Sequence, residues 1–138
     1  MGDSAEKNPR GILIADDCEV MVRVLCTLLN EGGHQVAATA ADGIEAVRLF
    51  RQLNPELVIM DINMPRMNGL EATRRIIQLR PDAKVIILSI EVDKATVLQA
   101  MKCGAAHYIA KPIQPDRLLS IVGSLLAEQS VASQTGSG

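Results

Sequence analysis

Four short apolar runs limit most strongly what this chain can fold into. Each is followed at once by a residue that carries a charge or a hydroxyl group. The residues that follow the runs are Asp16 with Asp17, Asp61, Ser89 and Lys111. Short apolar runs between turn residues are typical of strands buried on both faces, as in a parallel sheet. Ligand sites of open parallel sheets lie beyond the carboxyl ends of the strands. We therefore expect three carboxylates, one hydroxyl and one ammonium group to meet in a single crevice.

The length and composition indicate one domain with an aliphatic core. A chain of 138 residues is typical of a single domain and needs neither a disulfide nor a structural metal to fold. Apolar residues make up 48 % of the chain, yet it contains no Trp, one Tyr and one Phe. Ile, Leu, Val, Ala and Met must therefore fill the core.

The charge and the cysteines argue against several classes of protein. Fourteen basic and sixteen acidic residues give a net charge of −2 without a basic block, so we expect no nucleic-acid binding by this domain. No apolar stretch approaches the roughly 18 residues of a membrane span. Three cysteines without a CxxC pair fit free thiols in a reducing compartment, and the polar N-terminus is unlike a signal peptide. We expect a cytoplasmic location and no membrane association.

Strand and helix signals alternate along the chain. The pattern predicts five strands, near residues 11–15, 35–39, 57–60, 84–88 and 106–110, with helices between and after them. Asp42 and Asn68 are predicted N-caps, with Glu45 and Glu71 as their capping-box partners, and Pro115 is predicted to open the last helix. Such alternation calls for right-handed crossovers and a doubly wound parallel sheet. We expect residues 1–10 and 129–138 to be flexible and residues 11–128 to form the domain.

These residues match a known family over about residues 11–127. The matching features are Asp16-Asp17, Asp61 within Met60-Asp61-Ile62-Asn63-Met64-Pro65, Gly69, Ser89, Lys111-Pro112, and Tyr108 three residues before the lysine. In this order, each at a strand end, they are highly specific. The chain closely resembles the receiver domain of bacterial two-component response regulators, in particular the chemotaxis type. The resemblance implies a flavodoxin-like sheet with strand order 2-1-3-4-5.

The resemblance also implies a role for each residue of the crevice. Asp61 would accept a phosphoryl group. Asp17, Asp61 and the backbone carbonyl of Asn63 would bind Mg²⁺ or Mn²⁺ directly, and Asp16 would act mainly through a water molecule. Lys111 would pair with Asp61 at rest and with a phosphoryl oxygen afterwards. The Lys111-Pro112 peptide bond is commonly cis in the family.

A switch and three tuning positions follow from the same resemblance. Ser89 would move toward the phosphoryl group, and Tyr108 would turn into the vacated space, which changes the surface formed by residues 94–103, 106–110 and the last helix. Asn63 and Glu91 occupy positions that tune dephosphorylation in the family. Ile90 departs from the usual Ala or Gly, and our hypothesis is that it narrows access to the site.

The leading interpretation is a stand-alone receiver that acts as a phosphorylation-controlled docking module and takes its phosphoryl group from a histidine kinase or a histidine phosphotransfer protein. It would then bind an unknown downstream protein, as a monomer or as a phosphorylation-dependent homodimer. Two alternatives stay open, a shuttle that passes the group to another histidine and a fragment of a larger regulator.

Two further classes are less well supported. A phosphatase with an aspartyl-phosphate intermediate would need an acid where Asn63 stands, so we expect no turnover beyond self-catalysed phosphorylation and dephosphorylation. A degenerate receiver that only binds partners is disfavoured because every site residue is present.

Overall fold

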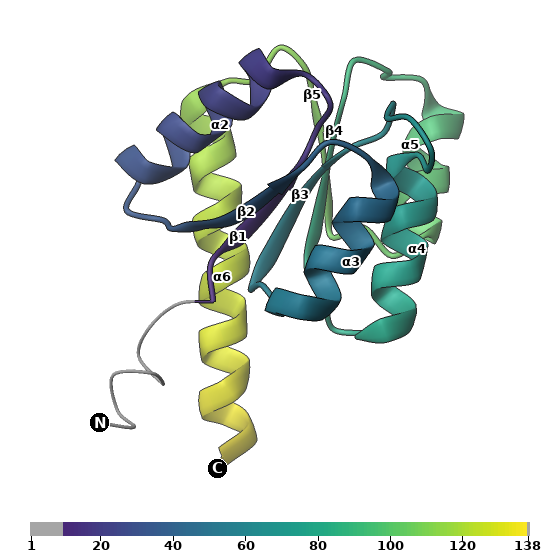
Figure 1. Cartoon of the computed structure of the whole chain (residues 1–138). Coiled ribbons are helices and arrows are strands. Elements are labelled where there is room, and N and C mark those ends of the chain that lie inside the picture. Colours follow the sequence, from purple (N-terminus) through teal and green to yellow (C-terminus); the bar gives the residue numbers. More distant parts are fainter. Residues whose placement is uncertain (1–9, 138) are drawn as a thin grey trace.

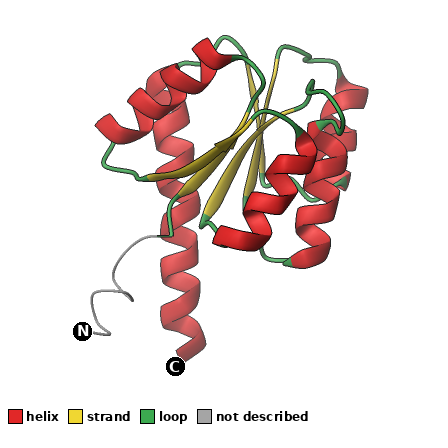
Figure 2. Cartoon of the chain, viewed as in Figure 1, coloured by secondary structure: helices red, strands yellow, loops and turns green. Residues whose placement is uncertain are grey.

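A computed structural model of the chain describes residues 10–137, with side chains described to residue 128. Within this part, strands and helices alternate as the sequence predicts (Figures 1 and 2). The elements in chain order are β1 (Ile12–Ala15), α2 (Glu19–Glu31), β2 (Val36–Ala40), α3 (Gly43–Leu53), β3 (Leu57–Asp61), α4 (Gly69–Leu79), β4 (Val85–Ser89), α5 (Lys94–Lys102), β5 (His107–Ala110) and α6 (Pro115–Ser137).

The five strands form one parallel sheet in the order β2-β1-β3-β4-β5, which confirms the predicted fold class and strand order. The spatial order of the strands reverses between β1 and β3. From β1 the chain continues to β2 on one side of the sheet, and from β3 it continues to β4 on the other side. Helices α2 and α6 cover one face of the sheet, and α3, α4 and α5 cover the other (Figure 1). A crevice opens beyond the carboxyl ends of strands at such a reversal.

Two aliphatic clusters hold the layers together because successive strand residues point to opposite faces. On the face under α2 and α6 the strands contribute Ile12, Ile14, Leu57, Ile59, Ile86 and Leu88. On the face under α3, α4 and α5 they contribute Leu13, Ala15, Val58, Met60, Val85 and Ile87. All of these side chains are almost completely buried, which explains why the strands read as uninterrupted apolar runs.

Three strands, β2, β3 and β4, end one residue later than the sequence indicates, and the extra residues of β3 and β4 belong to the predicted site. Asp61 ends β3 and pairs in register with Leu88, whereas Ser89 ends β4 and pairs with Ala110. Their backbones are therefore fixed by the sheet rather than by loops.

The predicted caps are confirmed, but both glutamate carboxylates bind groups other than the cap N–H that a capping box would use. Asp42 accepts the Glu45 N–H at 2.8 Å, and the Glu45 carboxylate accepts the Ala41 N–H at 2.9 Å, one residue before the cap. At the start of α4, Asn68 accepts the Glu71 N–H at 2.9 Å. The Glu71 carboxylate binds two arginines one turn ahead in the helix instead.

Helix α6 is longer than the apolar pattern suggests. It begins at Pro115, as predicted, and its backbone continues to Ser137, so the predicted domain boundary at residue 128 falls inside a helix. The flexibility expected of residues 129–138 stays a prediction, and the segment 1–9 lies outside the described residues. None of the described helices has the length and apolar character that a bilayer span requires.

Candidate functional site

Three aspartates converge at the carboxyl edge of the sheet, as the sequence predicts. Asp16 and Asp17 follow the end of β1, and Asp61 ends the adjacent strand β3. One carboxylate oxygen from each of the three lies within 4.8 Å of the others. Asp16 and Asp61 are buried, whereas Asp17 is exposed at the mouth of the crevice. The cluster can therefore be reached from solvent at Asp17.

Lys111 lies between the two buried carboxylates. Its Nζ atom is 3.1 Å from Asp61 Oδ1 and 3.2 Å from Asp16 Oδ2, and its side chain is only 14 % exposed. The other oxygen of Asp16 accepts the Cys18 N–H at 2.9 Å. The predicted Lys111–Asp61 pair is thus confirmed. The direct contact with Asp16 was not foreseen, because the resemblance described Asp16 only as a residue that acts on the metal, mainly through a water molecule.

The charges of the site shift the pKa values of two residues. Burial and the neighbouring Asp16 raise the pKa of Asp61, and Lys111 offsets this only in part. Burial alone would lower the pKa of Lys111, but Asp61 and Asp16 together hold it above its ordinary value. Lys111 therefore keeps its positive charge, whereas the negative charge of the Asp61 carboxylate is only partly balanced by its surroundings.

The donor set of the cluster fits a hard divalent cation. Three carboxylates against one ammonium group leave an excess of negative charge, and a cation among their oxygens would relieve it. Mg²⁺ and Mn²⁺ favour such carboxylate oxygens and keep several water ligands, for which the exposed side at Asp17 leaves room. Asn63, exposed two residues beyond Asp61, lies on the loop that follows β3.

Ser89 and Tyr108 are linked through the backbone of Glu91. The buried Ser89 Oγ accepts the Glu91 N–H at 3.0 Å, and the half-buried Tyr108 hydroxyl donates to the Glu91 carbonyl at 2.6 Å. The sequence singled out Glu91 for its side chain only, and its role as a shared anchor carries no sequence signal. Ile90 lies between Ser89 and Glu91 in the sequence, and 71 % of its surface is exposed.

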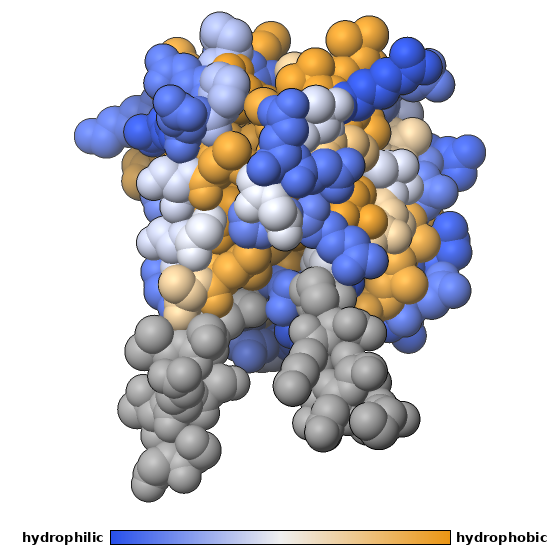
Figure 3. Space-filling model, turned by 90° about the vertical axis from the view of Figure 1, so that its left-hand side faces the viewer, coloured by the Kyte–Doolittle hydropathy of each residue, from blue (hydrophilic) through white to orange (hydrophobic). Residues whose placement is uncertain are grey.

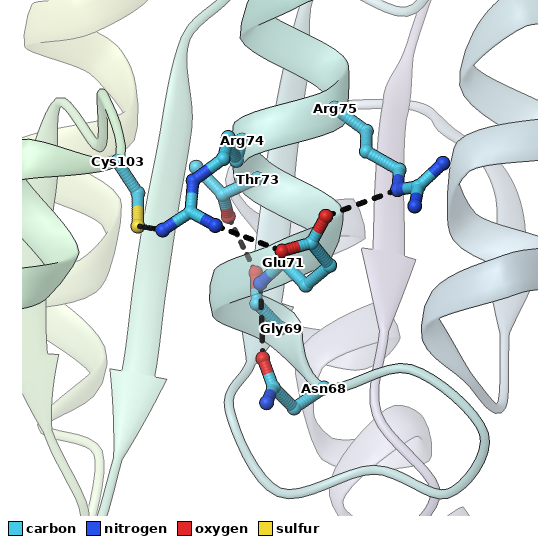
Figure 4. Close-up of polar contacts among 7 residues, drawn as sticks. All are labelled: Asn68, Gly69, Glu71, Thr73, Arg74, Arg75 and Cys103. Carbon is cyan, nitrogen blue, oxygen red and sulfur yellow. Dashed lines mark hydrogen bonds and ion pairs between the residues drawn. The ribbon is translucent and has the colours of Figure 1, made fainter.

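The loop from β3 to α4 is packed against the backbone of Asp61. A Cβ atom at Gly69 would lie 2.0 Å from the Asp61 carbonyl oxygen, so only glycine fits there. The Gly69 N–H donates to Ile62 O at 2.8 Å. The Gly69 carbonyl accepts the Thr73 hydroxyl at 2.7 Å (Figure 4). The start of α4 therefore fixes the position of Asp61. The family motif flagged Gly69, and the close approach supplies the reason.

The last predicted feature of the crevice follows β5. The Lys111-Pro112 peptide bond is cis, as expected, and the Lys111 N–H donates to Ser89 O at 2.8 Å. The structure thus brings Asp16, Asp17, Asp61 and Lys111 together. Ser89 lies at the end of the strand between them.

The family assignment rests on the match of residues 12–123 to the model of the response regulator receiver domain. The chain belongs to this family of receiver domains. Receivers are signalling modules that accept a phosphoryl group on an aspartate and bind Mg²⁺ at an acidic pocket.

The chain is similar to two chemotaxis proteins and to part of a transcriptional regulatory protein. The chemotaxis protein CheY of Thermotoga maritima is 39 % identical over 114 residues, which span 83 % of this chain and 95 % of that protein. The transcriptional regulatory protein DegU of Brevibacillus brevis is 40 % identical over 123 residues, 88 % of this chain but 52 % of that protein. The CheY chain of a Borrelia burgdorferi CheX-CheY-BeF₃-Mg²⁺ complex superposes with a TM-score of 0.79, at 32 % identity over 83 % of this chain and 87 % of that chain.

Proposed function

We propose that Asp61 is the phosphoacceptor of this receiver. The observation that supports this most is the position of Asp61, which is fixed by strand β3, lies 3.1 Å from the Lys111 ammonium and shares its pocket with two other carboxylates. In the reaction an Asp61 oxygen forms a bond to phosphorus as the phosphorus–nitrogen bond of a phosphohistidine breaks. The electron pair of that bond returns to the imidazole.

The acidic cluster would hold the metal that this transfer requires. Asp17, Asp61 and the Asn63 carbonyl are the proposed direct ligands of Mg²⁺ or Mn²⁺, with Asp16 bound mainly through water. When bound, the cation neutralises phosphoryl oxygens and aligns them with the attacking carboxylate. The chain's own contribution is to place the carboxylates rigidly, because β1 and β3 are neighbouring strands in register.

Lys111 and Ser89 would receive the new phosphoryl oxygens. The Lys111 ammonium can leave a carboxylate for a phosphoryl oxygen, since lysine is a compact charge on a flexible stem. The Ser89 Oγ already accepts the Glu91 N–H, which leaves its O–H to donate. Charge-assisted bonds of this kind are about twice as strong as neutral ones. Together they would supply part of the roughly 5.5 kcal/mol that a near-complete change of state needs.

The proposed output surface lies over α5, β5 and α6. Here a groove of about 570 Å³ is lined by Val92, Val97, Tyr108 and Arg117, among others. Tyr108 belongs both to this groove and to the hydrogen bonds around Glu91. A shift of Ser89 toward a phosphoryl group would therefore reach the groove through one residue. We propose that a downstream protein binds there.

The phosphodonor is proposed to be a histidine kinase or a histidine phosphotransfer protein that docks beside the acidic cluster. Helix α2 begins two residues after Asp17 and exposes Val20 to 70 % and Val24 to 43 %. The side of the molecule that carries α2 shows apolar residues among hydrophilic ones (Figure 3). Exposed apolar residues beside a reactive site favour a protein donor.

The stand-alone role is the form of the proposal we favour, since the chain covers nearly all of the Thermotoga maritima CheY. The DegU match, which covers about half of that regulator, keeps open a fragment of a larger protein. Transfer from the phosphorylated chain back to a purified histidine domain would identify a shuttle, and the reading frame beyond residue 138 would identify a fragment.

The remaining parts of the proposal concern turnover, location and assembly. We propose no turnover on outside substrates, because Asn63 cannot act as an acid. The three free cysteines suit the cytoplasm, where thiols stay reduced. The active form is a monomer or a phosphorylation-dependent homodimer, which light scattering before and after phosphorylation would distinguish.

The proposal is tested by incubating the protein with Mg²⁺ and a small acyl phosphate and resolving the products on phosphate-affinity gels. We expect a retarded band in the wild type, no such band for Asp61→Asn, and none when the metal is chelated. A retarded band of equal intensity in Asp61→Asn would refute Asp61 as the acceptor.

A further inference from the structure

A second groove, separate from the acidic crevice and from the proposed output surface, lies between α3 and α4. Its volume is about 470 Å³. Ile44, Val47 and Met67 line it with apolar side chains, and Arg48, Arg51 and Arg75 line it with guanidinium groups. We call these six residues the arginine groove. Nothing in the proposed phosphotransfer uses them.

The positive charge of the arginine groove is only partly neutralised. Arg48 lies 3.7 Å from Glu45, and Arg75 lies 3.1 Å from Glu71. Each glutamate also has a second partner: Glu45 accepts the Ala41 N–H, and Glu71 pairs with Arg74. Arg51 takes part in none of the ion pairs formed by the side chains described here, and no acidic side chain among them lines the groove. A surface of this sign stands out in a chain whose net charge is −2.

The apolar part of the groove limits what can fill it. Ile44 is 48 % exposed, and on helix α3 it shares one face with Val47, Arg48 and Arg51, at positions i, i+3, i+4 and i+7. A small inorganic anion would leave Ile44 in contact with water. A single-stranded nucleic acid would find no aromatic residue to stack on among the residues that line the groove. An apolar ridge flanked by carboxylates matches both parts of the groove.

We propose that the arginine groove binds an acidic amphipathic helix of a protein partner. One or two aliphatic side chains of that helix would lie on Ile44, Val47 and Met67. Its carboxylates would pair with Arg51 and Arg75, since the guanidinium fork matches a carboxylate in bidentate geometry. The interaction is weak and salt-sensitive, because the ion pairs are exposed.

The neighbouring arginines of α4 supply a matched control. Arg74 and Arg75 both pair with Glu71, and their side chains are 52 % and 54 % exposed. Figure 4 shows them leaving Glu71 in opposite directions, with Arg74 directed toward Cys103. Only Arg75 lines the groove. Substitution of either residue removes the same charge from the same helix.

The test uses a helix-forming peptide of about 15 residues, long enough to be partly helical alone, with a leucine ridge flanked by glutamates. Its affinity for the full chain is measured by fluorescence anisotropy, and its position by amide chemical shifts. We expect shifts at α3 and around Met67. We expect about threefold weaker binding to the Arg75→Gln variant, for which Arg74→Gln is the matched control, and about tenfold weaker binding to the Arg51→Gln/Arg75→Gln variant. The Arg74→Gln variant, and the same peptide with glutamine for glutamate, are the controls. We expect Arg74→Gln to bind the glutamate peptide as the wild type does, and the glutamine peptide to bind weakly.

Four outcomes would overturn the proposal. The first is the absence of shifts at α3, and the second is equal binding by the wild type and the double variant. The third is equal binding of the glutamate and glutamine peptides, which would show an apolar patch without charge recognition. The fourth is a single-stranded oligonucleotide that occupies the groove where the peptide does not. None of these outcomes depends on Asp61, so phosphotransfer can fail or succeed independently.

Discussion

Ser89 and Tyr108 bind opposite ends of one backbone unit. The Ser89 Oγ accepts the N–H of Glu91 at 3.0 Å, and the Tyr108 hydroxyl donates to the carbonyl of the same residue at 2.6 Å. Ser89 ends β4 beside Asp61, whereas Tyr108 lies on the edge strand β5 and lines the proposed output groove. A displacement at one hydroxyl therefore reaches the other across a single residue. This gives the proposed switch a short physical path.

The first prediction concerns Tyr108→Phe, which keeps the ring and removes the donor. The Glu91 carbonyl loses its bond, so we expect faster amide exchange at residues 91–93 and a loss of about 1 kcal/mol in the free energy of unfolding. Hydrogen exchange followed by mass spectrometry measures the first effect and urea unfolding the second. Exchange in this loop as slow as in the wild type would show that the bond does not hold it.

The second prediction concerns the charge of Asp61 without metal. Its pKa in the folded protein is raised above the ordinary 3.8, so its contribution to stability is greatest below that value and is lost as pH rises through the raised pKa. Asparagine carries no charge at any pH. We therefore expect Asp61→Asn to be more stable than the wild type at neutral pH in the presence of a chelator. The difference should shrink as the pH is lowered, which urea unfolding from about pH 4 to about pH 8 would show. A less stable variant at neutral pH would contradict the raised pKa.

The third prediction concerns the cation. A ligand that binds only the folded state stabilises it, by about 1.4 kcal/mol at ten times its dissociation constant. We expect Mg²⁺ to raise the Tm of the wild type and to have little effect on Asp17→Asn. Asp82→Asn is the control, because Asp82 precedes β4 at the opposite edge of the sheet. An equal rise in Asp17→Asn and the wild type would place the cation elsewhere.

The fourth prediction compares two glycines. A Cβ atom at Gly69 would lie 2.0 Å from the Asp61 carbonyl, so Gly69→Ala must displace backbone. We expect the free energy of unfolding to fall by about 2 kcal/mol or more, and Mg²⁺ binding to weaken. At Gly123 in α6 nothing lies within 4 Å of such an atom. Gly123→Ala should stabilise the protein by up to about 1 kcal/mol, since alanine favours helix. Similar effects of the two substitutions would rule out the steric argument.

The fifth prediction tests the clearest departure from the family pattern, Ile90. Ile90 is exposed next to Ser89, and our hypothesis is that it narrows the route of small molecules to Asp61. Ile90→Ala should accelerate phosphorylation by a small acyl phosphate, whereas Val92→Ala, exposed in the same loop, should not. Stopped reactions resolved on phosphate-affinity gels give both rates. Equal rates in the wild type and Ile90→Ala would remove the hypothesis.

The meeting of the site residues at one edge of the sheet was the most predictable feature of this molecule. The apolar runs before Asp16, Asp61 and Ser89 are buried on both faces, and this leaves a strong pattern in the sequence. Since parallel strands end at the same edge, the meeting of the aspartates followed from the strand assignment alone. The roles given to Lys111 and Tyr108 needed the family resemblance, because a lysine or a tyrosine after a strand has many uses.

The features that sequence reasoning missed depend on distances or on backbone groups. The direct contact of Lys111 with Asp16 depends on the reach of a flexible side chain across the sheet. The anchor at Glu91 is a peptide group, which every residue possesses. Glu71 was expected to complete a capping box, but Arg74 and Arg75 lie one turn away and compete for its carboxylate. The length of α6 exceeds what its apolar positions indicate.

The most direct test of the account is to locate the phosphoryl group on the chain. The protein is phosphorylated with a small acyl phosphate in the presence of Mg²⁺. The aspartyl phosphate formed on the protein is then trapped by reduction, and the peptides are sequenced by mass spectrometry. The account predicts a single modified residue, Asp61, and no modification in Asp61→Asn. Modification of Asp16 or Asp17 instead, or of an unrelated residue, would contradict it.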